Sequence, residues 1–227
     1  MGKMKMGILS AFKGKIGTVV GQRWRGAVMF QRAYTDDVRQ PNTEAQQVRK
    51  GIFRAMVQLS KGFYPAHVIG MREISIRKPT MTTDNEFFRV NKSKITASGI
   101  ESVSVDFTGL IVAEGPVPSV HFNTPQFDTP LQVDVDFDDN MEVARTHEDD
   151  EVFVWVYCPD AKGGVLSEAA KRTDGSVSVK VPSYWNGMKV HVYGFVRSCG
   201  KPLAGGYRAF NPYQCSESTY LGTGNIG

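Results

Sequence analysis

Residues 133–138 read Val-Asp-Val-Asp-Phe-Asp, a strict alternation of apolar and charged side chains. A period of two is typical of a β-strand that buries one face and leaves the other in water. The pattern therefore predicts a strand in a sheet that covers a core on one side only. The three carboxylates, Asp134, Asp136 and Asp138, are expected on its outer face.

Other stretches on either side of this strand also have the character of strands. Residues 152–157 are nearly all apolar, as in a central strand, and the alternation returns at 177–181. Apolar residues recur again at 190–195, and turn-forming Gly, Pro, Asn and Asp residues separate the runs. About seven strands over about 120 residues predict an immunoglobulin-like antiparallel β-sandwich over residues 94–210, with no disulfide between its sheets.

Residues 41–93 follow a helical period instead, beginning with the run Pro-Asn-Thr-Glu. Asn and Thr can cap a helix, Glu suits its first turn, and apolar residues then recur every three to four positions. A short second helix is expected within 66–78, and a third over 83–90 with Thr83 or Asp84 as its cap. The predicted fold class is therefore α+β.

The N-terminal residues 1–40 have a third character. Residues 14–26 read GKIGTVVGQRWRG, in which glycines recur among β-branched and basic residues. Residues 18–20 and 27–30 suit the two strands of a hairpin. Because a glycine-rich strand invites close approach by another backbone, we expect an arm that pairs with a neighbouring chain. The tail, 211–227, is expected to be a loop, an arm or a late edge strand.

The net charge of +4 conceals an asymmetry along the chain. Residues 1–78 hold 15 Lys and Arg against 4 Asp and Glu, a net of +11. Residues 79–227 hold 12 against 19, a net of −7. Opposed charges could attract copies into a head-to-tail oligomer, the basic part could meet nucleic acid, or both could be solvated surfaces of a monomer.

Six residues of the arm are the candidate subunit-interface residues. The basic side chains would dock on an acidic neighbour, with the tryptophan as a buried anchor. In the alternative, the same side chains contact DNA phosphates and the tryptophan stacks on a base. The six residues are Lys13, Lys15, Arg23, Trp24, Arg25 and Arg32.

Catalytic signatures are weak throughout the sequence. The four histidines are scattered, and the Ser10–Lys13 match to SxxK is one of spacing alone. The arm glycines do not fit a dinucleotide-binding loop. We therefore expect no enzymatic activity and no cofactor.

The three aspartates of residues 134–138 are the weak metal candidates, because carboxylate oxygens suit a hard cation. The run fails the calcium-loop pattern, since Asp139 stands where the turn glycine belongs and Arg145 where the final Glu belongs. A solvated strand face that discourages edge pairing is the expected reading.

Three cysteines without CxxC spacing suggest a reduced, cytoplasmic origin and count against an extracellular adhesin-like module. The sequence has no run of eighteen apolar residues, so no membrane partner is expected.

Residues 14–26 and 41–53 (PNTEAQQVRKGIF) resemble the start of a family of uncharacterised proteins from gut-bacterial genomes, prophages and phages. The resemblance continues at 152–159 (VFVWVYCP), 177–182 (VSVKVP) and 190–196 (VHVYGFV). It implies an arm, a helical segment and a β-sandwich, and no known catalytic residues.

The phage association of that family implies a structural subunit of a virion. Tail-barrel rings of short-tailed gut phages are built from similar small sandwiches with interlocking arms, so a tail or connector ring protein is expected. Its partners would be copies of itself, the portal and neighbouring ring or tail proteins, with DNA in the lumen and assembly in the host cytoplasm. The alternative is a DNA-binding or packaging-associated protein that uses the basic first third.

Overall fold

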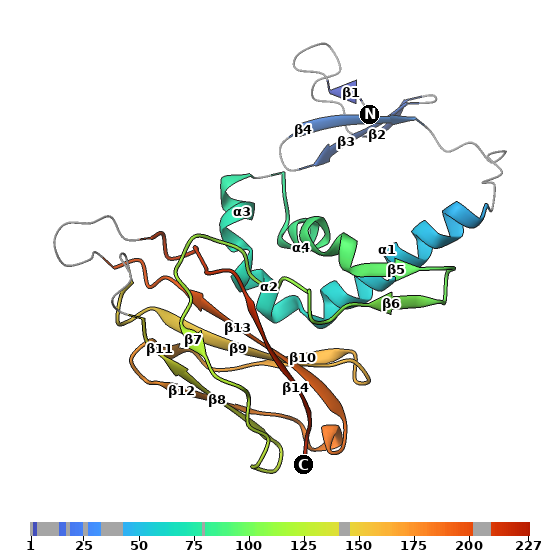
Figure 1. The fold of residues 1–227 in the computed structure, drawn as a ribbon. Coiled ribbons are helices and arrows are strands. Elements are labelled where there is room, and N and C mark those ends of the chain that lie inside the picture. Colours follow the sequence, from blue (N-terminus) through green and yellow to red (C-terminus); the bar gives the residue numbers. More distant parts are fainter. Residues whose placement is uncertain are drawn as a thin grey trace. The chain divides into compact units, whose positions relative to one another are not determined.

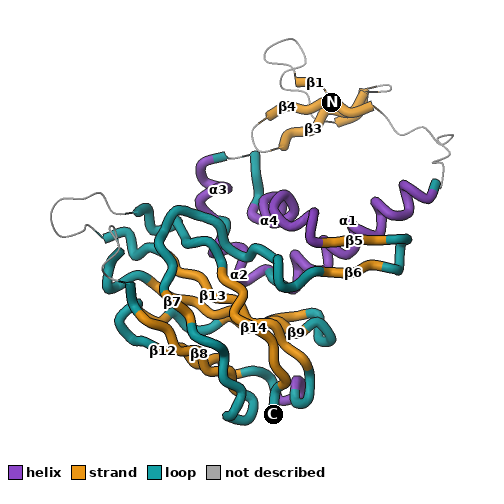
Figure 2. The backbone as a smooth tube through the Cα atoms, viewed as in Figure 1, coloured by secondary structure: helices purple, strands orange, loops and turns teal. Residues whose placement is uncertain are grey.

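The computed structural model describes residues 2–3, 14–16, 19–24, 27–32, 43–78, 80–140, 146–201 and 210–227 (Figures 1 and 2). The first four of these ranges are strands described by their backbone alone. The chain divides into two compact units, residues 1–43 and residues 44–227.

The first unit contains a four-stranded antiparallel sheet in the order β1-β4-β3-β2. β3 and β4 form a hairpin whose last pair is Trp24 opposite Ala27, and β2 places Gly14 opposite Gly21. The strands are β1 (Gly2–Lys3), β2 (Gly14–Ile16), β3 (Val19–Trp24) and β4 (Ala27–Arg32).

The second unit begins with four helices: α1 (Glu44–Gly62), α2 (Tyr64–Gly70), α3 (Arg72–Arg77) and α4 (Thr83–Asn91). As its helical period predicts, α1 buries Met56 and Leu59 and exposes its basic residues. A short 3₁₀ turn, η1 (Lys92–Lys94), follows α4.

The predicted cap of the third helix is wrong by one residue. Thr82 has an extended backbone, and its hydroxyl oxygen accepts a hydrogen bond from the Asn85 N–H at 3.0 Å. Thr83 and Asp84 already lie inside α4. Two successive threonines are equally good caps by side chain, so backbone conformation decides between them.

Two antiparallel sheets follow the helices, with strand orders β12-β8-β7 and β10-β9-β13-β14. β11 also pairs with β9, and a separate hairpin joins β5 to β6. The first sheet consists of β7 (His121–Phe122), β8 (Gln132–Asp138) and β12 (Ser176–Lys180). The second consists of β9 (Glu151–Cys158), β10 (Gly163–Leu166), β11 (Ala170–Lys171), β13 (Lys189–Arg197) and β14 (Thr219–Asn225). The hairpin is β5 (Ile95–Ala97) and β6 (Val103–Val105), and a 3₁₀ turn, η2 (Ser183–Trp185), precedes β13.

This arrangement is immunoglobulin-like. In such domains strands A, B and E form one sheet and C, F and G the other. Taken in chain order, β7, β8 and β12 occupy the places of A, B and E, and β9, β13 and β14 those of C, F and G, with β10 added beside β9. The α+β class and the sandwich expected from the sequence are confirmed.

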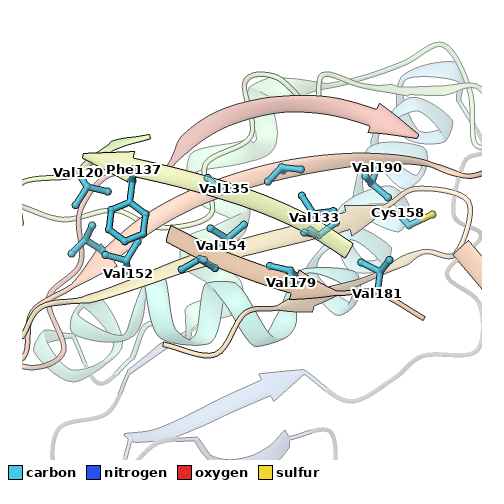
Figure 3. Packing of buried hydrophobic residues seen from close by; sticks show 14 of the residues in the cluster. Val120, Val133, Val135, Phe137, Val152, Val154, Cys158, Val179, Val181 and Val190 are labelled. Atoms are coloured by element: carbon cyan, nitrogen blue, oxygen red, sulfur yellow. The ribbon is translucent and has the colours of Figure 1, made fainter. Parts of the chain in front are cut away.

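A valine-rich core fills the space between the two sheets (Figure 3). Val133, Val135 and Phe137 of β8 point into it, and the aspartates between them face outward. Val154 of β9 and Val179 of β12 complete adjoining layers of the same cluster. The period of two at residues 133–138 therefore matches the alternation of buried and outward-facing positions along β8.

The other face of the large sheet is covered by the helices. Phe153, Trp155 and Tyr157 alternate with the valines of β9 and join a second core around Phe63, which follows α1. The tryptophan of strand C in antibody domains lies between the sheets, whereas Trp155 lies on the helical side. Helices, large sheet and small sheet thus form three layers, and β9 is apolar on both faces.

The C-terminal tail forms an edge strand. Of the three possibilities expected from the sequence, a loop, an arm or a late edge strand, the structure shows the third. β14 pairs with β13, and Ile226 just beyond it is buried in the valine-rich core. Gly224 permits this fit, because a Cβ there would lie 2.4 Å from the Phe127 ring. Among the helices in the described ranges, none has the length and apolarity needed to cross a bilayer.

Candidate assembly surfaces

Four of the six predicted interface residues lie in the sheet of the first unit. Lys15 is in β2 opposite Val20, and Arg32 is in β4 opposite Val19. Arg23 and Trp24 end β3. The other two, Lys13 and Arg25, lie outside the described residues. The register therefore brings Lys15, Arg23, Trp24 and Arg32 into one small antiparallel sheet.

The three aspartates of β8 lie on the outer face of the small sheet, and we call this row of carboxylates the acidic face. Asp136 and Asp138 are exposed. Asp134 is half-buried and accepts hydrogen bonds from Gln132 Nε2 at 2.8 Å and Ser178 Oγ at 2.5 Å. Alternate residues of a strand stand about 7 Å apart, so these carboxylates are spread along the sheet.

The structure does not gather the acidic face into a metal centre. Across the described ranges, no three His, Cys, Asp or Glu side chains are placed to hold one ion. Asp134 already has two hydrogen-bond donors from its own sheet. What the face offers is negative charge along a pleated surface.

The strand beside the acidic face, β12, has one unpaired edge within the described sheet. Gly175 O accepts from the Phe137 N–H at 2.9 Å, and the Val181 N–H donates to Leu131 O at 2.9 Å. Because the backbone groups of an antiparallel strand alternate in direction, those of Ser176, Ser178 and Lys180 point away from β8.

A hollow of about 340 Å³ runs along this edge between β10 and β12. Val165, Leu166 and Val179 line it together with Glu168. An unpaired strand edge of this kind is a template for a strand from another chain. The acidic face and the β12 edge are therefore adjoining parts of one candidate surface.

The chain also brings together a serine, a histidine and an aspartate that the sequence keeps apart. Ser60 Oγ donates to Asp84 Oδ1 at 2.6 Å and lies 3.3 Å from His67 Nε2. In a catalytic triad the acid holds the opposite ring nitrogen from the serine. Here Asp84 Oδ1 is also near Nε2, at 3.5 Å, and the buried Nδ1 has no hydrogen-bond partner among the described residues.

Burial dominates the behaviour of this histidine. His67 is fully buried, and desolvation lowers its pKa, while the Ser60 carbonyl and the Asp84 carboxylate act in the opposite direction. A neutral imidazole that anchors α2 against α1 and α4 is what the geometry supports. No sequence signal could have shown this cluster, because Ser60 and Asp84 are 24 residues apart.

A charged group holds the loops at one end of the sandwich. Lys171 Nζ and Lys201 Nζ lie 2.8 and 2.6 Å from Asp149 oxygens, and they lower the pKa of Asp149 to about 2. Beneath them, buried Arg172 donates to Asp150 Oδ2 at 3.3 Å and to the Pro118 carbonyl at 2.8 Å. These contacts tie separate loops together, and each charge has a protein partner.

The structure thus defines an α+β protein whose immunoglobulin-like sandwich is covered on one face by helices, with a β12 edge that no described strand pairs beside an acidic face. The chain belongs to a family of unknown function, DUF6266, whose model matches residues 11–207. The match spans strands β2 to β4, the helices and the sandwich through β13, in agreement with the resemblance noted from residues 14–53. No curated protein and no solved structure matches the chain.

Proposed function

We propose that the chain is a structural subunit of a bacteriophage particle, a tail or connector ring protein that assembles with copies of itself. The observation that carries the proposal is the edge of β12 that no other described strand pairs, beside the acidic face. The N-terminal segment has the matching character, since residues 1–35 contain seven Lys and Arg and no Asp or Glu. One copy therefore carries both halves of a charge-complementary contact.

Such a contact suits a ring. A cyclic assembly needs a heterologous interface, in which two different surfaces of the same chain meet. The N-terminal sheet of one copy would add to the β12 edge of the next, so that backbone hydrogen bonds hold the pair. The basic residues would meet Asp136 and Asp138, which raises the rate of encounter and fixes the register.

The phage setting rests on the resemblance of residues 14–53 to proteins of prophages and phages. In that setting assembly would take place in the host cytoplasm, and the portal and neighbouring tail proteins would be the other partners. Buried, unpaired Cys158 and Cys215 are compatible with a reducing compartment.

Oligomeric state tests the proposal directly. The full chain should give one large, uniform oligomer by native mass spectrometry and light scattering. Asp136→Lys with Asp138→Lys should give monomers, because four units of charge change beside the β12 edge. Glu148→Lys with Asp160→Lys is the matched control, with the same charge change on exposed residues elsewhere.

Trp24→Ala is a second variant to be measured in the same experiment. Truncation of an interface tryptophan typically costs about 2 kcal/mol or more of binding free energy, so the oligomer should dissociate at concentrations where the wild type stays assembled. A wild-type chain that remains monomeric at high micromolar concentration would refute the proposal.

The alternative is a DNA-binding or packaging-associated protein. It is favoured by one further observation, the exposed basic residues Arg49, Lys50, Arg54 and Lys61 on α1. A monomer that binds duplex DNA, with an affinity that falls steeply as salt rises, would support this alternative over the ring.

A further inference from the structure

A groove of about 420 Å³ lies between α1 and the β5–β6 hairpin, away from the acidic face. One wall is a face of α1 that includes Ala55 and Leu59. The other is formed by Val103, Val105 and Phe107, three alternate residues of β6 and its continuation, all of them only half-buried. The groove is therefore a concave, largely apolar surface at the edge of a strand.

The edge of β6 that borders this groove has backbone groups that do not pair with β5. β6 pairs only with β5 in the described structure, and the bonds fall at alternate residues: Asp106 N–H to Lys94 O at 2.9 Å, and Ser98 N–H to Ser102 O at 3.0 Å. The groups of Val103 and Val105 therefore point away from β5, and on that side the Val103 N–H donates to the Glu101 carbonyl at 3.2 Å. A two-stranded hairpin is marginal by itself, and a third strand would add to the cover of the half-buried valines.

The polar side chains that line the groove include a hydroxyl that can donate a hydrogen bond to a ligand. Tyr157 lines it, is only 4% exposed, and its hydroxyl has no hydrogen-bond partner among the described residues. Its ring is held in place by Phe63, with centroids 4.3 Å apart. Burial raises the pKa of Tyr157 to about 12, so the hydroxyl stays protonated and can donate.

Two cations complete the polar side. Arg54 and Lys162 line the groove, and neither forms an ion pair within the described ranges. Glu101 is the one acidic residue along the described lining. An uncharged donor with two free cations suits a carboxylate, and the single acid at the rim disfavours a densely acidic ligand.

We propose that this groove binds an extended segment of a partner protein, which pairs with the β6 edge and places one carboxylate against Tyr157, Arg54 and Lys162. The N-terminal strands of a second copy do not fit, because residues 1–35 contain no carboxylate side chain. The chain's own alternating acidic run, residues 133–138, is already paired within its sandwich as part of β8. The proposed partner is therefore a different protein, whose segment alternates apolar residues with an Asp or Glu. The inference does not depend on the proposed ring.

The test selects peptides without assuming their sequence. A displayed library of random dodecapeptides is selected on the full chain, with Arg54→Glu/Lys162→Glu as the counter-selected variant. Enriched sequences should contain Asp or Glu flanked by β-branched or aromatic residues. Synthetic versions should bind at least tenfold more weakly to that variant, and Arg49→Glu/Lys61→Glu, with the same charge change on α1 outside the groove, should bind as the wild type does.

Two finer variants locate the contact. Tyr157→Phe keeps the ring and removes the hydroxyl, and should weaken binding by roughly three- to tenfold. Two sets of peptides are N-methylated, one at the odd-numbered amides and one at the even-numbered amides. Only one of the two sets should lose binding, because only alternate N–H groups of the bound segment face β6. Binders that lack an acidic residue, that bind all variants equally, or that tolerate methylation in both sets would overturn the proposal, as would a selection with no enrichment.

Discussion

Truncating Phe63 tests whether the helices and the sandwich of residues 44–227 unfold as one body. The ring is fully buried between the layers, with centroid distances of 4.3 Å to Tyr157, 5.6 Å to Tyr193 and 5.9 Å to Trp155. A buried Phe→Ala change costs about 3–5 kcal/mol of unfolding free energy. In a domain of this size each kcal/mol moves the midpoint by about 2–4 °C, so Phe63→Ala should lower Tm by roughly 6–20 °C.

Urea unfolding of the full chain measures the effect with two probes. A Trp24→Phe background leaves Trp155, on the helical side of the large sheet, and Trp185, between the sheets, as the fluorophores. Circular dichroism follows the helices. If the layers form one body, Phe63→Ala should shift both transitions together. Phe53→Ala is the matched control, because its ring is 64% exposed and should cost less than about 1 kcal/mol.

Separate transitions would refute this reasoning. If Phe63→Ala moved the helical signal and left the fluorescence transition in place, the helices would be an independent unit. A loss no larger than that of Phe53→Ala would mean that the aromatic core around Phe63 contributes little.

Four further outcomes are expected. The free energy of unfolding should fall as pH drops below about 6.5, because burial holds the pKa of His67 below its value in the unfolded chain, and the stabilisation by neutral His67 is complete only above that unfolded value. His67→Leu should flatten the dependence of stability on pH in urea titrations from pH 8 to pH 5. An unchanged dependence would mean that other groups cause it. Deleting residues 1–35 should leave the Tm of residues 44–227 unchanged but give monomers by light scattering. An oligomer that survives the deletion would show that the arm does not form the contact between subunits. Assembly followed by stopped-flow scattering should slow as salt rises, since charges are screened over about 8–10 Å, and formed oligomers should persist; equal rates at low and high salt would remove the electrostatic contribution. Chelator should change neither the oligomer nor Tm, and stoichiometric calcium found by elemental analysis, lost as the oligomer dissociates, would make the acidic face a metal site.

Burial explains which parts of the fold could be predicted from the sequence. The aspartates at 134, 136 and 138 and the valines at 177 and 179 alternate because each strand has one covered face, and a period of two records that directly. The amphipathic spacing of α1 did the same for a helix. The error at Thr82 has a local cause, because neighbouring threonines differ only in backbone conformation.

The remaining features depend on tertiary arrangement. The apolar run at 152–157 predicted a central strand but could not say that helices would cover one face and a second sheet the other. The buried ion pair of Arg172 and Asp150 joins residues 22 positions apart, and no sequence pattern around either residue predicts the other as its partner. The groove beside β6 is equally hidden, since it needs α1, the hairpin and Tyr157 together.

The layered fold restricts where partners can bind. β9 and β13 are covered on both faces, so within residues 44–227 neither strand offers a face to another chain, and the surfaces that remain include the acidic face, the strand edges and the exposed side of α1. The two edges differ in charge: β12 borders carboxylates, whereas β6 borders Arg54 and Lys162. A basic strand is therefore favoured at β12 and opposed at β6, and a strand with a carboxylate has the reverse preference. On these grounds the two proposed contacts do not compete, and one chain can join a copy of itself through β12 while it holds a different protein through β6.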